Sequence, residues 1–156
     1  GGMRQRLMFV AALLGDPEIL ILDEPTANFD PDFKQDFLNV IMQFMESGKK
    51  SVIIASHILD ELDRIADYLI YLDKGELVYS GDIESFRDKY RIISGESYKV
   101  KLLKQEDIIH VEDRKYGTKA LVVNHGYSKY DGALTVTVPT LEEFMYHYSK
   151  RGESVI

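Results

Sequence analysis

The first 55 residues alternate between helical and strand-like hydrophobic patterns. Apolar side chains recur with helical spacing over residues 4–14, and Gly15 follows as a helix stop. Two short apolar runs come next, Ile19 to Leu22 and Ser51 to Ala55. Unbroken apolar runs of this length predict strands that are buried on both faces of a parallel sheet.

A helix signature separates the two predicted strands. Asp30 has the side chain of a good N-cap, and Pro31 suits the first helical position because no N–H is needed there. We expect this helix to run to about Glu46 and to stop at Gly48. Strands that alternate with helices predict an α/β fold with a parallel sheet, whose catalytic groups lie at the carboxyl ends of the strands.

The hydrophobic spacing after the second strand predicts a helix, a hairpin and another helix. A turn at Lys74 and Gly75 separates the hairpin strands, and Asp82 is expected to open the second helix. The predicted bounds are 59–66 for the first helix, 68–73 and 76–80 for the hairpin strands, and 82 to about 90 for the second helix.

Residues 93–96 (Ile-Ser-Gly-Glu) have the composition of a linker, which divides the chain into two expected domains. Residues 1–93 would form the α/β core, and residues 94–156 a small α+β module. Thr140, with Glu143 three residues later, forms a capping box that predicts where the last helix begins. The other elements expected in the module are strands at 98–103, 119–123 and 133–138 and a short helix from residue 105.

Charge and composition narrow the possible functions. The chain has 26 acidic and 19 basic residues and a net charge of −7, so nucleic acid is not expected as a direct partner. It has no cysteine, which excludes disulfides and thiolate metal sites. The longest apolar run, Leu7 to Leu14, is eight residues, far shorter than the roughly 20 that span a bilayer.

The strongest chemical signal lies at the ends of the two predicted strands. Asp23 and Glu24 follow the first strand, and His57 follows the second. Neighbouring parallel strands end on the same side of a sheet, so we expect these side chains to converge. One carboxylate would hold Mg²⁺ with phosphate oxygens and water, a second would polarise an attacking water, and the imidazole would donate to a phosphate oxygen. Taken singly, exposed loop acids and a histidine bonded to nearby backbone are the simpler interpretations.

Gly1 and Gly2 stand directly before the first predicted helix. Glycines let backbone N–H groups approach an anion, and the N-terminus of a helix favours negative charge. The segment is therefore a candidate phosphate-binding site, although a flexible chain start explains the two glycines better when they are considered alone.

Together these motifs resemble the ATP-binding-cassette (ABC) ATPases over about residues 1–91. Gly1 to Gln5 is similar to the end of the family's signature motif, without the Leu-Ser that usually precedes it. The resemblance implies a partial P-loop NTPase core. The remaining matches are Ile19 to Asp23 with the Walker B strand, Glu24 with the catalytic glutamate, residues 27–30 with the D-loop and His57 with the switch histidine.

In this family two nucleotide-binding domains enclose two ATP molecules, each between the Walker A loop of one subunit and the signature motif of the other. The resemblance therefore implies that Gly1, Gly2 and Gln5 touch the γ-phosphate of the partner's ATP. Asp30 would connect the two sites across the dimer. The implied cofactors are ATP and Mg²⁺. The implied partners are a second nucleotide-binding subunit and a transmembrane permease, which would hold the ATPase at the cytoplasmic face of the plasma membrane.

The resemblance also assigns catalytic roles. Asp23 would hold Mg²⁺ through water, and Glu24 would act as general base or position the lytic water. His57 would contact the γ-phosphate and stabilise charge in the transition state. Leu141 to Tyr146 resembles the closing helix of cassette ATPases of the ABC-2 exporter type. The expected function is thus an exporter ATPase subunit that couples ATP hydrolysis to transport.

The 156 residues contain no phosphate-binding loop of the form G-x-x-x-x-G-K-[ST]. Gly48 to Ser51 contains Gly-Lys, but Gln43 stands where the first glycine is needed and a predicted strand follows. We therefore expect the C-terminal part of a cassette, which begins within the signature motif and lacks Walker A. Alone, it is expected neither to bind MgATP tightly nor to hydrolyse it.

Two other functions fit parts of the sequence. ATPase heads of chromosome-maintenance and DNA-repair proteins share the signature, Walker B and switch elements, but they follow a long coiled coil and usually bind DNA. The acidic charge and the absence of a heptad tract favour the exporter. A non-enzymatic alternative makes residues 95–156 a dimerisation or regulatory unit, and a stable dimer of that segment would favour it.

Overall fold

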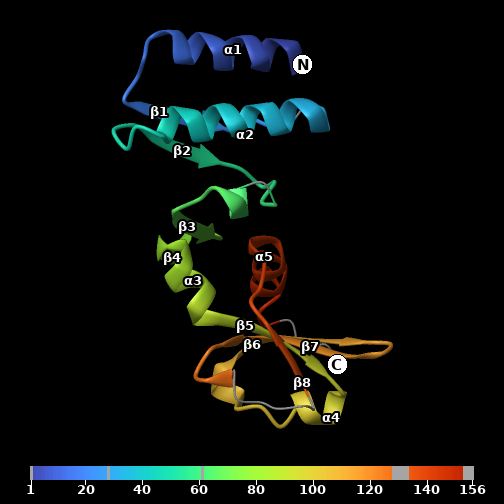
Figure 1. Ribbon diagram of the computed structural model, residues 1–156. Coiled ribbons are helices and arrows are strands. Elements are labelled where there is room, and N and C mark those ends of the chain that lie inside the picture. Colours follow the sequence, from blue (N-terminus) through green and yellow to red (C-terminus); the bar gives the residue numbers. More distant parts are fainter. Residues whose placement is uncertain (1, 28, 61, 128–133, 153–156) are drawn as a thin grey trace. The chain divides into compact units, whose positions relative to one another are not determined.

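The computed structural model describes residues 2–27, 29–60, 62–127 and 134–152 (Figure 1). The chain divides into two compact units, the first from Gly1 to Ile65 and the second from Ala66 to Ile156. Each unit has its own secondary structure and its own hydrophobic core.

The first unit is a parallel pair of strands with two helices. Its elements are α1 (Gly2–Leu14), β1 (Ile19–Asp23), α2 (Pro31–Met45), β2 (Ser51–Ala55) and a 3-10 turn (Leu62–Arg64). β1 and β2 pair in parallel, with Asp23 opposite Ala55. As predicted, Asp30 caps α2, because its side chain accepts a hydrogen bond from the N–H of Phe33 at 2.9 Å. These elements confirm the α/β class.

Both helices cover the same face of the strand pair (Figure 1). Leu20 of β1 packs with Phe9 of α1 and Phe37 of α2, and all three side chains are buried. The rings of Phe9 and Phe37 lie 4.7 Å apart between centroids, so they join the two helices. This aromatic contact fixes α1 against α2 above β1.

The opposite face of β1 and β2 is open in this unit, which corrects the expectation that both faces are buried. Ile19, Ile21 and Ile53 are 59%, 73% and 57% exposed. Side chains alternate across a strand, so the residues between them face the helices while these three point away. The apolar run identifies the strands, but described residues cover only one of their faces.

The helix predicted over residues 59–66 is wrong, because the described residues of this range form a 3-10 turn at Leu62–Arg64 and no α-helix. The N–H of Asp63 donates to the carbonyl of Leu59 at 2.9 Å, and the N–H of Ile65 donates to the carbonyl of Leu62 at 3.1 Å. Ile65 then packs against the core of the first unit, so the chain turns toward the core and does not continue as a helix.

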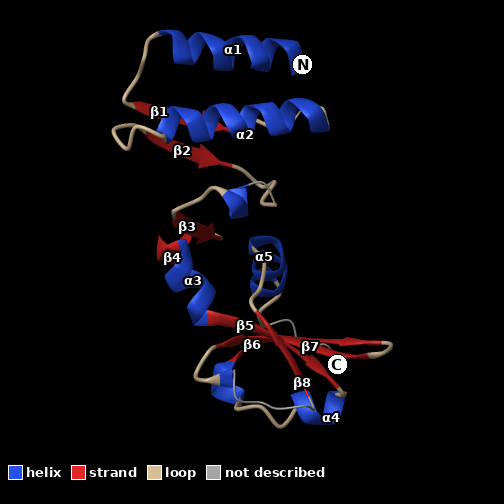
Figure 2. Ribbon diagram, in the orientation of Figure 1, coloured by secondary structure: helices blue, strands red, loops and turns tan. Residues whose placement is uncertain are grey.

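The second unit combines a hairpin with a four-stranded antiparallel sheet (Figure 2). Its elements are β3 (Tyr68–Asp73), β4 (Glu76–Asp82), α3 (Ile83–Lys89), β5 (Tyr90–Gly95), α4 (Ser97–Val100), a 3-10 turn (Gln105–Asp107), β6 (Ile108–Arg114), β7 (Gly117–Val123), β8 (Leu134–Thr137) and α5 (Leu141–Ser149). The strand order in the sheet is β6-β7-β5-β8.

The predicted hairpin turn at Lys74 and Gly75 and the capping box of Thr140 and Glu143 are confirmed. In the part of the chain that the structure describes, no helix is long and apolar enough to cross a bilayer.

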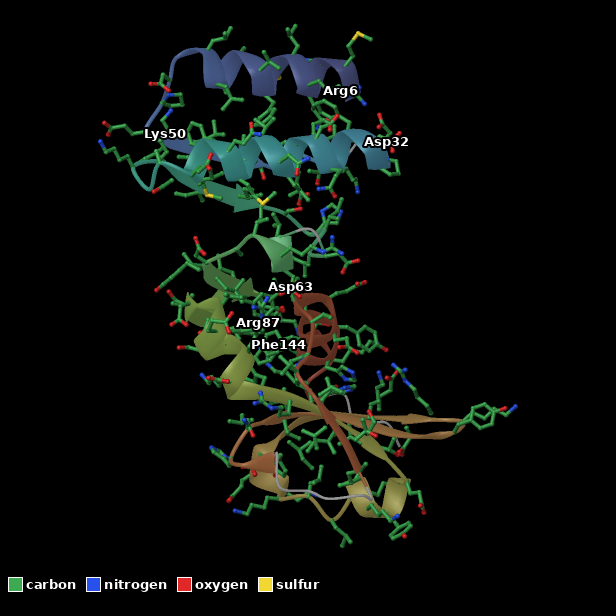
Figure 3. All side chains as sticks on the ribbon, in the orientation of Figure 1. Arg6, Asp32, Lys50, Asp63, Arg87 and Phe144 are labelled. Carbon is green, nitrogen blue, oxygen red and sulfur yellow. The ribbon has the colours of Figure 1, made fainter. Side chains whose placement is uncertain are left out.

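Aromatic side chains join α5 to the hairpin, to α3 and to β5. Phe144 of α5, labelled in Figure 3, lies 5.6 Å from Tyr71, 4.9 Å from Phe86 and 4.6 Å from Tyr90 between ring centroids. Each such pair adds about 0.5 to 1.5 kcal/mol beyond its buried area. Phe144 therefore anchors α5 within this unit.

Three predictions for the C-terminal part of the chain are wrong. The expected linker at residues 93–96 contains the end of β5, because Ile92 and Ile93 are fully buried in the sheet. The strand expected at 98–103 is replaced by the short helix α4 and a turn, and β6 forms where the hydrophobic pattern indicated no strand. β5 runs through the expected domain boundary, so a functional division at that point stays a prediction.

Two buried histidines link α5 to β6. His110 and His147 are 5% and 2% exposed, and their Nδ1 atoms lie 2.9 Å apart, so one ring donates a hydrogen bond to the other. Burial, followed by the charge of His110, lowers the pKa of His147 to about 4. Glu112 opposes this shift, whereas Arg114 and Lys119 add to it. His147 therefore stays neutral in the folded chain at neutral pH.

Folding stability is expected to decrease as the pH falls from 6.5 to 4. In this window an unfolded chain binds a proton at His147 and the folded chain does not, which lowers the free energy of unfolding by at most about 3 kcal/mol. Urea unfolding at several pH values measures the effect. His147→Gln should flatten the pH dependence. Identical pH profiles for wild type and His147→Gln would contradict the assignment.

Candidate active site at the ends of two parallel strands

β1 and β2 end side by side and place polar side chains at one edge of the first unit. Asp23 is the last residue of β1, and the N–H of Glu24 donates to the carbonyl oxygen of Ala55 at 2.8 Å, which continues the strand pairing by one residue. Glu24 has a φ of +44°, which non-glycine residues adopt only rarely. Pro25 follows, so the chain leaves the sheet directly after the two carboxylates.

Glu24 and His57 are in direct contact. Nδ1 of His57 lies 2.8 Å from Oε1 of Glu24, and the backbone N–H of His57 donates to the same oxygen at 3.2 Å. The hydroxyl of Ser56 donates to Oε2 at 3.4 Å. Ser56 and His57, which follow β2, thus bind both carboxylate oxygens of Glu24, which follows β1.

The surroundings of Glu24 keep its carboxylate ionised. The hydrogen bond from the His57 side chain is the main cause that lowers the pKa of the Glu24 carboxyl, and partial burial opposes it. The Glu24 and His57 side chains are 40% and 71% exposed, so water and ligands can reach both. An ionised carboxylate beside an accessible imidazole can accept a proton from water while the ring faces an anion.

Asp23 provides an exposed carboxylate next to Glu24. Mg²⁺ needs only one or two carboxylates when phosphate oxygens and water complete its coordination. Over the described ranges, no group of three or more His, Cys, Asp or Glu side chains is arranged to hold a metal ion. Asp23 therefore fits an ion that arrives with a phosphate ligand, and not one that the protein alone would enclose.

The N-terminus of α1 is the candidate phosphate-binding site. Gly2 begins α1, whereas Gly1 lies outside the described residues. α1 has no acidic residue in its first turn, so an anion would meet the positive end of the helix dipole. Gln5 lies one turn further along α1 and is partly buried.

Asp30 contacts α1 through Arg6, a residue that the motifs did not single out. Oδ1 of Asp30 caps α2, and Oδ2 pairs with the guanidinium of Arg6. The hydrogen bond from the N–H of Phe33 is the main cause that lowers the pKa of Asp30, and the charge of Arg6 acts in the same direction. No sequence signal joins the two residues, because they lie on different helices.

The predicted site residues therefore fall into two groups. Residues 23–24 and His57 gather at the carboxyl ends of β1 and β2. Gly2, Gln5 and Asp30 belong to the N-terminal ends of α1 and α2. The pair formed by Arg6 and Asp30 connects these helix ends.

Gly48 is confirmed as a helix stop. Its φ is +67°, and its N–H donates to the carbonyl of Met45, the last residue of α2, at 2.9 Å. β2 follows, whereas a phosphate-binding loop precedes a helix. The Gly-Lys pair at this position is therefore a turn between α2 and β2.

Comparisons with known proteins find similarity to ABC transporters. The ABC transporter family matches residues 1–27. The energy-coupling factor transporter ATP-binding protein EcfA1 of Mycoplasma mobile is 36% identical over 124 residues, which cover 75% of this chain and 45% of that protein. The Nod factor export ATP-binding protein I of Cupriavidus pinatubonensis is 37% identical over 81 residues, which cover 52% of this chain and 25% of that protein.

A solved ATP-binding cassette of an ABC transporter, in its ADP conformation, covers 55% of this chain and 33% of its own length, with 25% identity and a TM-score of 0.46. The chain spans about a quarter of one curated relative and less than half of the other. The chain is similar to ATP-binding proteins of ABC transporters, the family that the ordered motifs resemble.

Replacing His57 by alanine is expected to raise the pKa of the Glu24 carboxyl toward its ordinary range, because the main hydrogen bond to the ionised form is lost. A carbon-13 NMR titration of the Glu24 carboxyl measures the shift. Ser56→Ala removes a weaker hydrogen bond and should raise the pKa less. Equal titration curves for wild type and His57→Ala would show that the contact does not form in solution.

Proposed function

We propose that this chain is the C-terminal part of the ATP-binding subunit of an ABC-type membrane exporter, which couples ATP hydrolysis to transport. The observation that carries the proposal is the contact between Glu24 and His57 at the ends of β1 and β2. Similarity to ATP-binding proteins of ABC transporters supports ATPase activity for the complete subunit.

Glu24 acts as the general base in this proposal. Its carboxylate is ionised and accessible, so it can orient a water molecule and accept a proton as that water attacks the γ-phosphate. Nδ1 of His57 donates to Glu24, so Nε2 is the nitrogen left for a phosphate oxygen, to which it donates when the ring is protonated. Glu24 thus orients the water, and His57 contacts the phosphate.

Asp23 would hold Mg²⁺, and ATP would be shared between two subunits. The ion, when bound, neutralises charge on the phosphate oxygens. Asp23 is the exposed carboxylate adjacent to the base, which suits this role. Gly1, Gly2 and Gln5 would contact the γ-phosphate of ATP bound to a second nucleotide-binding subunit, because the N-terminus of α1 favours an anion.

Similarity to an export protein supports an exporter, and an exposed apolar face of the strands supports the view that other residues of a cassette pack on this chain. The Cupriavidus pinatubonensis relative is a Nod factor export protein, and α5 contains the segment from Leu141 that resembles ABC-2 exporter ATPases. The exposed face of Ile21 and Ile53 is a surface that the rest of a complete cassette would cover. A transmembrane permease would then hold the subunit at the cytoplasmic face of the plasma membrane.

In the complete subunit, Glu24→Gln is expected to lower the rate of ATP hydrolysis by about 10²- to 10⁴-fold, because an amide cannot accept the proton. Affinity for MgATP should stay within about threefold of wild type, since the nucleotide contacts are kept. Phosphate release and nucleotide titration measure the two quantities. Glu46→Gln, at an exposed acid beyond α2, is the matched control and should change neither. Undiminished hydrolysis by Glu24→Gln would refute the assignment of the base.

The 156-residue chain alone is expected to bind MgATP only weakly, because its sequence contains no phosphate-binding loop. Isothermal titration calorimetry of the purified chain with MgATP tests this. Micromolar affinity would contradict the proposal that the main nucleotide contacts lie in residues outside this sequence.

A further inference from the structure

Arg6 joins the first helix to the start of the second. Its guanidinium carbon lies 4.0 Å from the centroid of the Phe33 ring, and its Nη2 pairs with Oδ2 of Asp30. Figure 3 shows Arg6 between α1 and the end of α2 at which Asp32 is labelled. Nε of Arg6 is buried and has no hydrogen-bond partner among the described residues, so stacking and the ion pair hold this side chain.

The two carboxylate oxygens of Asp30 have different partners. Oδ1 accepts from the N–H of Phe33 and caps α2, whereas Oδ2 pairs with Arg6 of α1. The cap lies within α2, but the ion pair crosses to another helix. A substitution can therefore remove the ion pair and keep the cap.

Asp30 ends a short segment that begins at Glu24. The N–H of Ala27 donates to the carbonyl of Glu24 at 3.4 Å, and the N–H of Phe29 donates to the carbonyl of Thr26 at 3.0 Å. The side chains of Thr26 and Phe29 are buried. Hydrogen-bonded turns with buried side chains resist deformation, so a displacement at Asp30 is passed on to Glu24.

We propose that Arg6 is a positioning residue that ties the phosphate-binding end of α1 to the segment that carries Glu24. This inference rests on the proposed function, because it requires phosphate at Gly2 and water at Glu24. A phosphate at Gly2 fixes α1, Arg6 passes the position of α1 to Asp30, and the segment back to Glu24 holds the carboxylate. In the proposed dimer that phosphate belongs to the partner's ATP, so the base of one site depends on nucleotide in the other.

The position of Arg6 in the helix favours this role over a purely structural one. Arg6 is the fifth residue of α1, and its guanidinium reaches Asp30 at the start of α2. The Arg6 and Asp30 side chains are 38% and 55% exposed, and an ion pair this exposed contributes little stability. Folding stability therefore does not explain the positive charge of Arg6, whereas a link between the ends of α1 and α2 does.

Hydrolysis by the complete subunit tests the proposal. Arg6→Met keeps the hydrocarbon stem over Phe33 and removes the charge, and Asp30→Asn keeps an oxygen for the cap. Each should lower kcat about tenfold or more with the KM for ATP unchanged, because misplacing a catalytic group by about 1 Å costs up to 10²-fold. The double variant should lose no more than either single variant, because both remove the same pair. Arg6→Lys should restore part of the rate.

Lys50→Met is the matched control, because Lys50 also pairs with an aspartate, Asp16, and also lies over an aromatic ring, that of Phe44. Lys50 precedes the first residue of β2, at the end of the strand pair opposite to Glu24, so Lys50→Met should retain kcat. In the 156-residue chain, the backbone amide NMR signal of Glu24 should shift in Arg6→Met and Asp30→Asn but not in Lys50→Met.

A kcat for Arg6→Met within about twofold of wild type, or losses that multiply in the double variant, would overturn the proposal. A wild-type subunit that hydrolyses no ATP would instead refute the proposed function. The Glu24 amide signal would then decide separately whether Arg6 positions that residue, and an unchanged signal in Arg6→Met would show that it does not.

Discussion

The parallel pairing of β1 with β2 is the constraint on which the candidate site depends. The register places Asp23 opposite Ala55, and one more hydrogen bond, from Glu24 to Ala55, brings the next carboxylate to His57. A slip of one residue would turn these side chains to the other face of the sheet. The contact between Glu24 and His57 is exposed and contributes little stability, so the backbone register holds the two groups together.

The register in turn depends on how the helices pack over one face of the strands. Leu20 of β1 lies beneath the contact between Phe9 and Phe37, which fixes α1 and α2 over the same strand. Glu24 then takes a backbone conformation that is rare for its residue type, which ends the strand at the carboxylates. Packing on one face thus sets the geometry at the strand ends, and the other face stays open in the described part of the chain.

Local sequence signals predicted the parts of the fold that local interactions determine. The helix stop at Gly48, the N-cap at Asp30 and the capping box at Thr140 all depend on a few neighbouring residues, and all three are confirmed. Ile93 was assigned to a linker, because its place in the sheet comes from pairing with Ala120 of β7, far away in the sequence. β6 was missed although it pairs with β7 across a short turn at residues 115–116. Strand pairing of this kind is not encoded in the hydrophobic period of one segment.

The candidate site shows the same division between local and long-range information. The convergence of Glu24 and His57 was predictable, because neighbouring parallel strands end on the same side of a sheet. The contact between Arg6 and Asp30 was not, since its partners lie on different helices and no motif spacing joins them. Motifs therefore located the reacting groups, whereas tertiary packing determines what holds them in place.

A crystal structure of the complete, assembled subunit with a non-hydrolysable MgATP analogue tests the central claim most directly. The account predicts that the Glu24 carboxylate and the His57 ring both face the γ-phosphate from the shared end of β1 and β2, with Asp23 beside the metal ion. A γ-phosphate bound away from this edge, or an imidazole on the opposite side of the sheet from the two carboxylates, would contradict it.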